Sequence, residues 1–79
     1  MYQAFVLLEK VEDVKRFVSV CNQMPFDVEL RAGEYVVDAK SIMGIFSLNL
    51  SQKIELRAAC TGEDAADFAQ RIQEFLAVD

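Results

Sequence analysis

The 79-residue chain is long enough for one domain, and its hydrophobic content of 53% is typical of a globular protein rather than a disordered one. Thirteen acidic and eight basic residues give a net charge of −5, which argues against nucleic acid or an anionic membrane as a partner. The apolar runs are too short to span a bilayer, and no charged-then-apolar leader precedes Phe5. We therefore expect a cytoplasmic protein without a signal peptide or transmembrane helix.

The first twenty-five residues predict a strand followed by a helix. Residues 2–8 are aliphatic, aromatic and β-branched, and the run is too short for a stable helix, so it indicates a strand. Apolar side chains then recur at steps of three and four, which predicts an amphipathic helix that ends at Asn22, before Pro25. The helix face expected to be buried consists of Val11, Val14, Val18 and Cys21, with Phe17 beside them.

A β-hairpin is predicted next. Residues 26–31 alternate between apolar and charged side chains, as in a half-buried strand. Residues 32–33 are Ala-Gly and are expected to form the turn, and residues 34–37 form the returning strand.

The second half of the chain predicts a short helix, a strand and a final helix. The short helix is expected over residues 41–48, and alternation over residues 54–60 indicates a fourth strand. Thr61 or a neighbour is expected to cap the last helix, with acidic residues in its first turn. Its buried stripe is expected to be Ala65, Phe68, Ile72 and Phe75.

This order, β-α-β-β-α-β-α over residues 1–79, predicts a single α+β domain. Each element has one apolar face, which predicts two layers in an open-faced sandwich. Three helices would cover one side of a four-stranded antiparallel sheet. The outward side chains of the second and fourth strands are charged, so the other side of the sheet should face water.

The segment "DAKSIMGIFSLNL" at residues 38–50 combines two polar positions with an excess of apolar side chains. Ser41 is expected to be the N-cap of the short helix. Asn49 is expected to close the helix in the left-handed conformation. A helix of about two turns buries only one side. Some of Ile42, Met43, Ile45, Phe46 and Leu48 should therefore reach solvent and form a partner surface. The alternative is that all of them fit in the core or in a crystal or dimer contact.

The sequence offers no set of residues for enzyme chemistry. It contains no histidine, its three glycines are isolated, and its carboxylates are spread over outward faces. Cys21 and Cys60 lack metal-ligand spacing and are expected to be small buried hydrophobes. We expect neither an enzyme nor a bound metal or cofactor.

The segment "KSIMGIFSLNL" resembles the regulatory-serine segment of HPr, the phosphocarrier of the bacterial sugar phosphotransferase system, and of its relative Crh. The element order, the turn near Gly33 and the Thr-Gly-Glu-Asp lead into the last helix also match that family. The resemblance covers most of the chain and implies the HPr fold. Ser41 matches the serine that a dedicated kinase phosphorylates in Gram-positive members. The alternative is that Ser41 is a plain helix cap that is not modified. Ile42, Met43 and Phe46 match apolar positions that bind partners such as enzyme I and the catabolite control regulator.

The chain departs from the family at the start of its first helix. There the resemblance requires a Gly-Ile-His-Ala-Arg-Pro type motif, whose histidine carries the phosphoryl group. This sequence instead has residues 8–13, Leu-Glu-Lys-Val-Glu-Asp, with Lys10 near the position of the lost histidine and Glu12 near the lost arginine. An exposed lysine is protonated at neutral pH, and three carboxylates would repel a phosphoryl donor.

We interpret the sequence as that of an HPr-like binding and regulatory module without histidine phosphocarrier activity, switched by phosphorylation of Ser41. Its expected partners are a serine kinase and a transcriptional regulator or a phosphotransferase-system protein. Two alternatives stay open at this point. One is a phosphocarrier with a non-histidine acceptor such as Lys10 or Cys21, and the other is a homodimer that buries the apolar helix surface.

Overall fold

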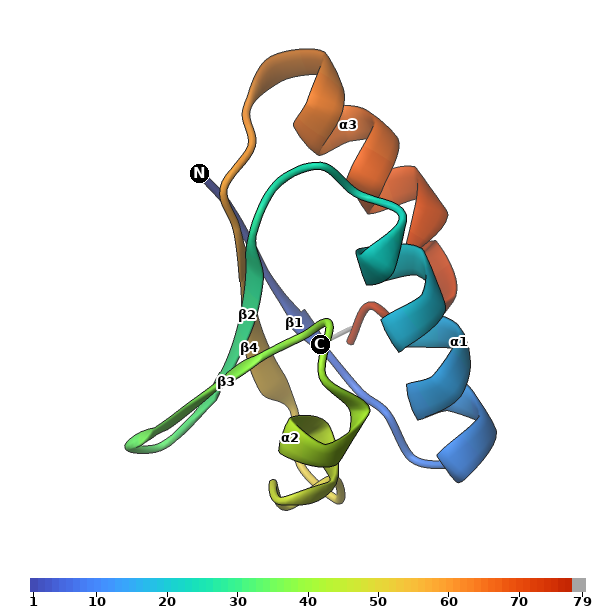
Figure 1. Cartoon of the computed structure of the whole chain (residues 1–79), viewed down its shortest axis with the longest axis vertical. Helices are drawn as coiled ribbons and strands as arrows, with labels where there is room; N and C mark the ends of the chain where they lie inside the picture. The colour runs from blue at the N-terminus through green and yellow to red at the C-terminus, as the bar shows by residue number, and fades with distance from the viewer. Residues whose placement is uncertain (78–79) are drawn as a thin grey trace.

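The computed structural model describes residues 1–77 and shows a four-stranded antiparallel sheet (Figure 1). The strands lie in the order β1-β4-β2-β3, so the two outer strands in space are the first and third in the chain. The bounds are β1 Tyr2–Val6, β2 Val28–Ala32, β3 Tyr35–Asp38 and β4 Ile54–Ala58. The predicted element order and the four-stranded antiparallel sheet are confirmed.

Three α-helices lie on one side of this sheet, as predicted (Figure 1). Their bounds are α1 Val11–Asn22, α2 Ile42–Phe46 and α3 Gly62–Arg71. The expected final helix is divided, because α3 ends before Ile72 and a 3₁₀ turn, η1 Gln73–Phe75, continues the chain. Thr61 stands at the N-cap position of α3, but its side chain makes no capping hydrogen bond.

The core lies between the sheet and the helices, and its side chains are aliphatic, aromatic or sulfur-containing. Phe17 packs edge-to-face on Phe75 at 5.6 Å between ring centroids, and Phe26 packs on Phe68 at 5.5 Å. Burial of rings this size supplies a large share of the stability of a small domain. The predicted buried face of the first helix is wrong at Val11, whose side chain is 56% exposed. The other residues predicted for that face pack against the core.

Several strand and turn limits differ from those expected. The first strand ends at Val6, and the hairpin turn is Gly33-Glu34, with Ala32 still in β2. Gly33 has a φ of 63°, a left-handed value that glycine adopts without steric cost. The fourth strand ends at Ala58 and not at Cys60, whose side chain is nevertheless buried.

The outer edge of β1 is covered by the C-terminal segment. Leu7 donates its backbone N–H to Phe75 at 2.8 Å, and Ala77 donates to Phe5 at the same distance. The opposite edge strand, β3, belongs to a hairpin that projects away from the helices (Figure 1). Among the helices of residues 1–77, none has the length and apolar character needed to span a membrane.

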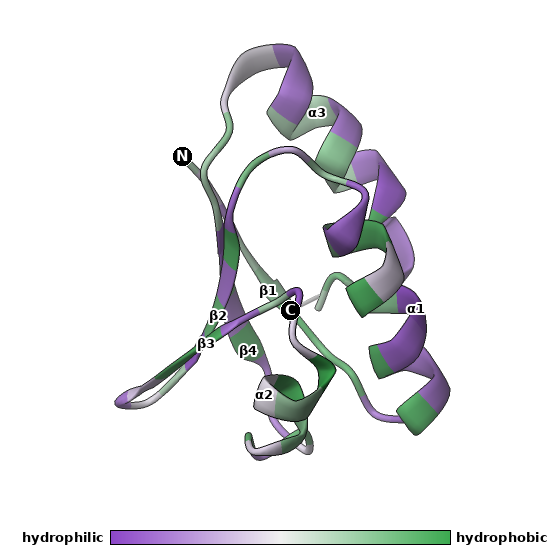
Figure 2. Cartoon of the chain, viewed as in Figure 1, coloured by the Kyte–Doolittle hydropathy of each residue, from purple (hydrophilic) through white to green (hydrophobic). Residues whose placement is uncertain are grey.

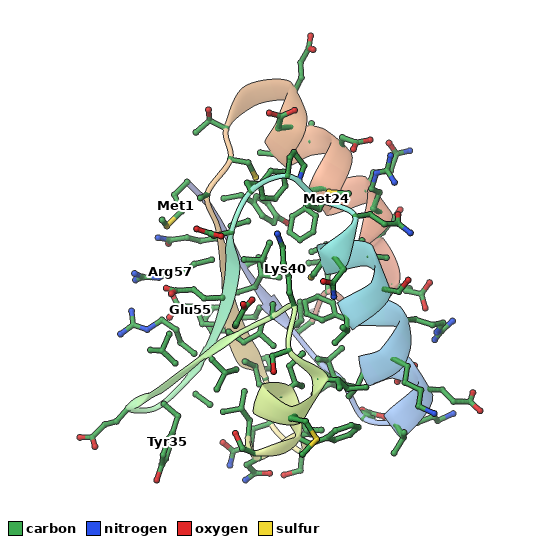
Figure 3. The ribbon with its side chains drawn as sticks, in the orientation of Figure 1. Met1, Met24, Tyr35, Lys40, Glu55 and Arg57 are labelled. Atoms are coloured by element: carbon green, nitrogen blue, oxygen red, sulfur yellow. The ribbon has the colours of Figure 1, made fainter. Side chains whose placement is uncertain are left out.

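The two central strands, β2 and β4, have charged side chains on the uncovered side of the sheet, as their alternation predicted. Figure 2 shows hydrophilic and hydrophobic residues mixed along the strands, and hydrophilic colour on the outer faces of α1 and α3. Glu55 and Arg57 extend from β4 away from the helices (Figure 3), and they form an ion pair at 3.2 Å. The two faces of the sheet therefore have different chemistry, one apolar and packed, the other exposed and charged along its two central strands.

Candidate functional site

Ser41 lies between β3 and α2 and caps α2, as the sequence predicted. Its Oγ accepts a hydrogen bond from the backbone N–H of Gly44 at 3.2 Å, and its backbone N–H donates to the carbonyl of Asp38 at 3.0 Å. The side chain is exposed to solvent. The hydroxyl is thus fixed at the start of the helix while it stays accessible to another protein.

The residue before Ser41 anchors this segment to the C-terminal end of α1. Lys40 Nζ donates to the carbonyl of Met24 at 3.0 Å, and Asn22 Nδ2 donates to the carbonyl of Lys40 at 3.1 Å (Figure 3 shows Lys40 directed toward Met24). A lysine that points inward and satisfies a loop carbonyl is not visible in sequence periodicity. These bonds hold the approach to Ser41 in one position.

The apolar residues of α2 divide into an inner and an outer set. Ile45 is fully buried, and Ile42 is half-buried and packs against the core. Met43 is 78% exposed and Phe46 is 41% exposed. Of the three side chains expected to contact a partner, Met43 and Phe46 project into solvent, whereas Ile42 contributes mainly to packing.

Gly44 allows α2 to approach the sheet closely. A Cβ atom at this position would lie 3.3 Å from the Cβ of Val37 on β3, which is tighter than ordinary contact. The absence of a side chain at Gly44 therefore lets α2 lie close to β3.

Asn49 does not have the predicted role. Within residues 1–77 only glycines have positive φ, so Asn49 is not in the left-handed conformation. The helix ends earlier, at Phe46, with Ser47 as its C-cap. Asn49 Oδ1 instead accepts hydrogen bonds from the backbone N–H of Ser51 at 3.1 Å and from its hydroxyl at 2.6 Å. This is the local turn chemistry that asparagine favours when the backbone is no longer helical.

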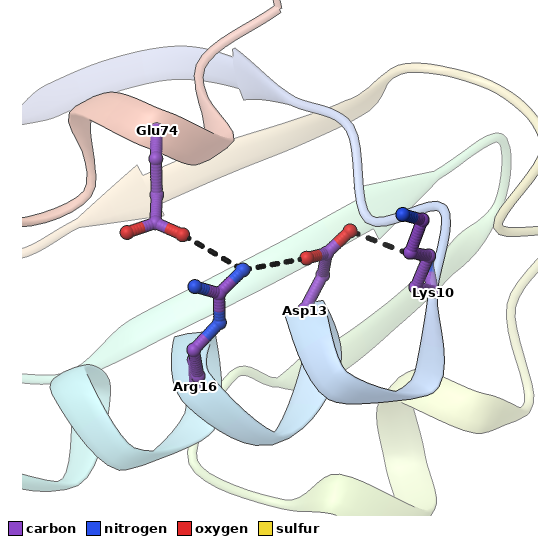
Figure 4. Close-up of polar contacts among 4 residues, drawn as sticks. All are labelled: Lys10, Asp13, Arg16 and Glu74. Carbon is purple, nitrogen blue, oxygen red and sulfur yellow. Dashed lines mark hydrogen bonds and ion pairs between the residues drawn. The ribbon is translucent and has the colours of Figure 1, made fainter.

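At the start of α1, the carboxylate of Asp13 caps the helix at Lys10. Asp13 Oδ2 accepts the backbone N–H of Lys10 at 3.3 Å (Figure 4). Arg16 Nη2 contacts Asp13 Oδ1 at 2.8 Å and Glu74 Oε1 at 2.9 Å. The Asp13–Arg16 pair has the i,i+3 spacing that a sequence reveals, but Glu74 reaches Arg16 only through the tertiary fold. A helix N-terminus otherwise suited to an anion is thereby occupied by this chain's own acid.

Both cysteines are buried free thiols. Burial raises the pKa of Cys21 to about 12, Lys40 opposes that shift and Asp38 adds to it. Burial also raises the pKa of Cys60. A thiol with a raised pKa is a poor nucleophile at neutral pH. Residues 1–77 contain no group of three or more His, Cys, Asp or Glu side chains placed to hold a metal ion.

A family model described as "PTS HPr component phosphorylation site" matches residues 13–77, which is most of the chain. The chain belongs to the PTS HPr family. Proteins of this family are phosphocarriers rather than enzymes. Ser41 and the whole of α2 lie inside the matched region, whereas Lys10 lies outside it.

Solved HPr structures have the same fold. HPr-C-His from Thermoanaerobacter tengcongensis gives a TM-score of 0.74 at 23% identity, over 94% of this chain and 89% of that one. Phosphocarrier protein HPr from Bacillus anthracis gives 0.69 at 23% identity, over 96% and 94%. Crh from Bacillus subtilis, which was solved as an intertwined dimer with a swapped domain, gives 0.62 at 29% identity over 94% and 88%.

Proposed function

We propose that this HPr-family protein is a binding and regulatory module that recognises a protein partner through α2, with phosphorylation of Ser41 as its switch. It does not act as a histidine phosphocarrier. The observation that carries the proposal is the exposure of Ser41 together with Met43 and Phe46 on one short helix. A kinase and a partner would therefore reach the same part of the surface.

Phosphorylation at Ser41 would change charge without changing the fold. A phosphate adds about −1.5 to −2 charges at pH 7, and the N-terminal end of a helix tolerates negative charge. The first turn of α2 contains no acidic side chain that would repel it. The surface beside Met43 and Phe46 would therefore become anionic, and this would alter partner choice.

The start of α1 supports the absence of histidine chemistry. The sequence contains no histidine, and the backbone N–H of Lys10 is already bound by Asp13. Arg16, the cation in this network, is held by Asp13 and Glu74. An incoming phosphoryl group would have to displace these carboxylates and would meet their repulsion.

Intact mass spectrometry after incubation with ATP and the serine kinase of a Gram-positive organism tests the switch. We expect one phosphate on the wild type and none on Ser41→Asn, which keeps a capping side chain but cannot be phosphorylated. A wild type that gains no mass would remove the switch from the proposal.

A pull-down tests the binding function separately. Wild type, Ser41→Asp and Met43→Ser would be compared as baits. We expect Ser41→Asp to change the set of captured proteins and Met43→Ser to weaken capture. Identical captures by all three baits would contradict recognition through α2.

The exposure of Phe46 also favours a second candidate, a homodimer that buries α2. Sedimentation at micromolar and lower concentrations would then show a dimer that Phe46→Asp dissociates. A phosphocarrier with an unusual acceptor is a third reading, but Cys21 is fully buried. This reading requires phosphorylation by enzyme I and phosphoenolpyruvate that is lost on changing Lys10 or Cys21.

A further inference from the structure

The uncovered face of the sheet carries four charged side chains in a square of alternating sign, at its centre. β4 contributes Glu55 and Arg57, and β2 contributes Glu29 and Arg31. The register places Arg31 opposite Glu55 and Glu29 opposite Arg57. Each charge therefore has an opposite charge both along its strand and across to the next strand. All four side chains are half-buried, so their positions are partly fixed.

Two large apolar side chains flank this square on the outer strands. Phe5 of β1 pairs in register with Glu55, and Val36 of β3 pairs with Arg31. Phe5 is 51% exposed and Val36 is 50% exposed. One row across the sheet thus reads Phe5, Glu55, Arg31, Val36, with apolar ends and a charged centre.

The next row across the sheet is polar throughout. It reads Gln3, Arg57, Glu29, Asp38 in the same strand order. A hollow of about 550 Å³ opens beside it, bordered by Met1 and Val36. The face is therefore not flat, and it can receive side chains from another molecule.

From this pattern we infer that the open face of the sheet binds the same face of a second copy of the chain, about a two-fold axis that runs along the strands between β4 and β2. Such an axis exchanges the strands of one copy for those of the other, β1 over β3 and β4 over β2. It places Glu55 against the partner copy's Arg31 and Arg57 against the partner copy's Glu29. Phe5 then meets the partner copy's Val36, so apolar ends meet apolar ends.

The alternative two-fold axis, across the strands, is less complementary. It would exchange the two rows and also pair opposite charges, but it would set Phe5 against Gln3 and Val36 against Asp38. Only the axis along the strands satisfies both the charges and the apolar side chains. Aligned sheets pack with their strands within about 30° of one another, so the match holds for the central strands.

Within one copy, the ion pairs on this face leave one charged side chain able to pair with a second copy. Arg57 pairs with Glu55 at 3.2 Å, whereas Arg31 forms no ion pair within residues 1–77. The guanidinium of Arg31 would gain a carboxylate from the second copy. Charge pairing of this kind gives specificity and orientation more than affinity.

The expected association is weak. Four strands spaced about 4.8 Å apart and about five residues long present a footprint of roughly 320 Å² per copy. The total of roughly 650 Å² is below the ~1,200 Å² of small stable interfaces. The dissociation constant should therefore lie in the high micromolar range. The helices, α2 included, lie on the other side of the sheet and stay accessible to other partners in such a dimer.

Complementary charge reversals test this arrangement. Arg31→Glu sets Glu against Glu twice in a self-pair, and Glu55→Arg sets Arg against Arg twice. Sedimentation velocity between about 20 μM and 1 mM, a range that brackets weak association, should show at least tenfold weaker self-association for each variant. An equimolar mixture of the two variants should recover wild-type association, because every cross-copy contact is again between opposite charges.

Two controls separate this proposal from other dimers. Lys15→Glu on α1 changes the net charge by the same amount as Arg31→Glu and should leave association unchanged. Phe46→Asp should also leave it unchanged, whereas it would dissociate a dimer formed through α2. Circular dichroism checks folding. If Arg31→Glu does not fold, Arg57→Glu and Glu29→Arg repeat the test on the second row.

Three outcomes would overturn the inference. The wild type could stay monomeric up to 1 mM, the single reversals could associate as the wild type does, or the mixture could fail to recover association. Failure here leaves the proposed role of Ser41 and α2 intact, because the kinase and pull-down experiments probe the opposite side of the sheet.

Discussion

Replacement of Ser41 tests how much the N-cap contributes to α2, and it supplies the control that any phosphorylation experiment needs. Ser41→Ala removes the hydrogen bond to the N–H of Gly44, which is 3.2 Å long and exposed. Loss of a serine cap costs about 0.5–2 kcal/mol of unfolding free energy. The low end applies, because α2 has only five residues and Ile45 holds it to the core. We expect a loss of about 0.5–1 kcal/mol.

Urea denaturation followed by circular dichroism measures this loss. With a slope of about 1 kcal/mol per molar urea for a small domain, the midpoint should fall by roughly 0.5–1 M. Ser41→Asn and Ser41→Asp keep a capping acceptor and should unfold close to the wild-type midpoint. A drop for Asn as large as that for Ala, or no drop for Ala, would refute the assignment of Ser41 as a cap. Binding changes seen only in Ser41→Asp can then be attributed to charge.

Three further outcomes follow from burial and from the raised thiol pKa. Phe68→Ala should lower the free energy of unfolding by about 3–5 kcal/mol, because the ring is fully buried, whereas Phe5→Ala should lower it by less than about 1.5 kcal/mol. Urea denaturation curves of equal slope check both values. Similar losses for the two variants would contradict the assigned core. Met43→Ser should shift stability by no more than about 0.5 kcal/mol, and a larger loss would show that the side chain is packed. The folded pKa of Cys21, about 12, lies above its ordinary value of 9.0, so the folded state holds the proton more tightly. Stability should therefore be full below pH 9 and fall as the pH rises toward 12. Cys21→Ala should flatten that fall, and an unchanged slope would remove the thiol as its cause.

The candidate site was only partly predictable from sequence. The cap at Ser41 followed from a serine before an apolar run, because capping is local backbone chemistry. The inward course of Lys40 and the contact of Arg16 with Glu74 did not follow, because they join segments far apart in the chain. Asn49 was assigned to the wrong conformation because α2 ends two residues before the position that the sequence pattern indicated.

The sequence by itself determined the order of the elements, the buried faces of the second and fourth strands and the absence of a histidine, because periodicity and composition need no tertiary context. The tertiary structure alone decided which apolar residues of α2 meet solvent, that Val11 is exposed, and which charges stand side by side on the open sheet. An amphipathic pattern gives the direction of a buried face, but the neighbours that cover it come from other parts of the chain. Those neighbours decide which residues at the edge of an apolar face are buried and which are exposed.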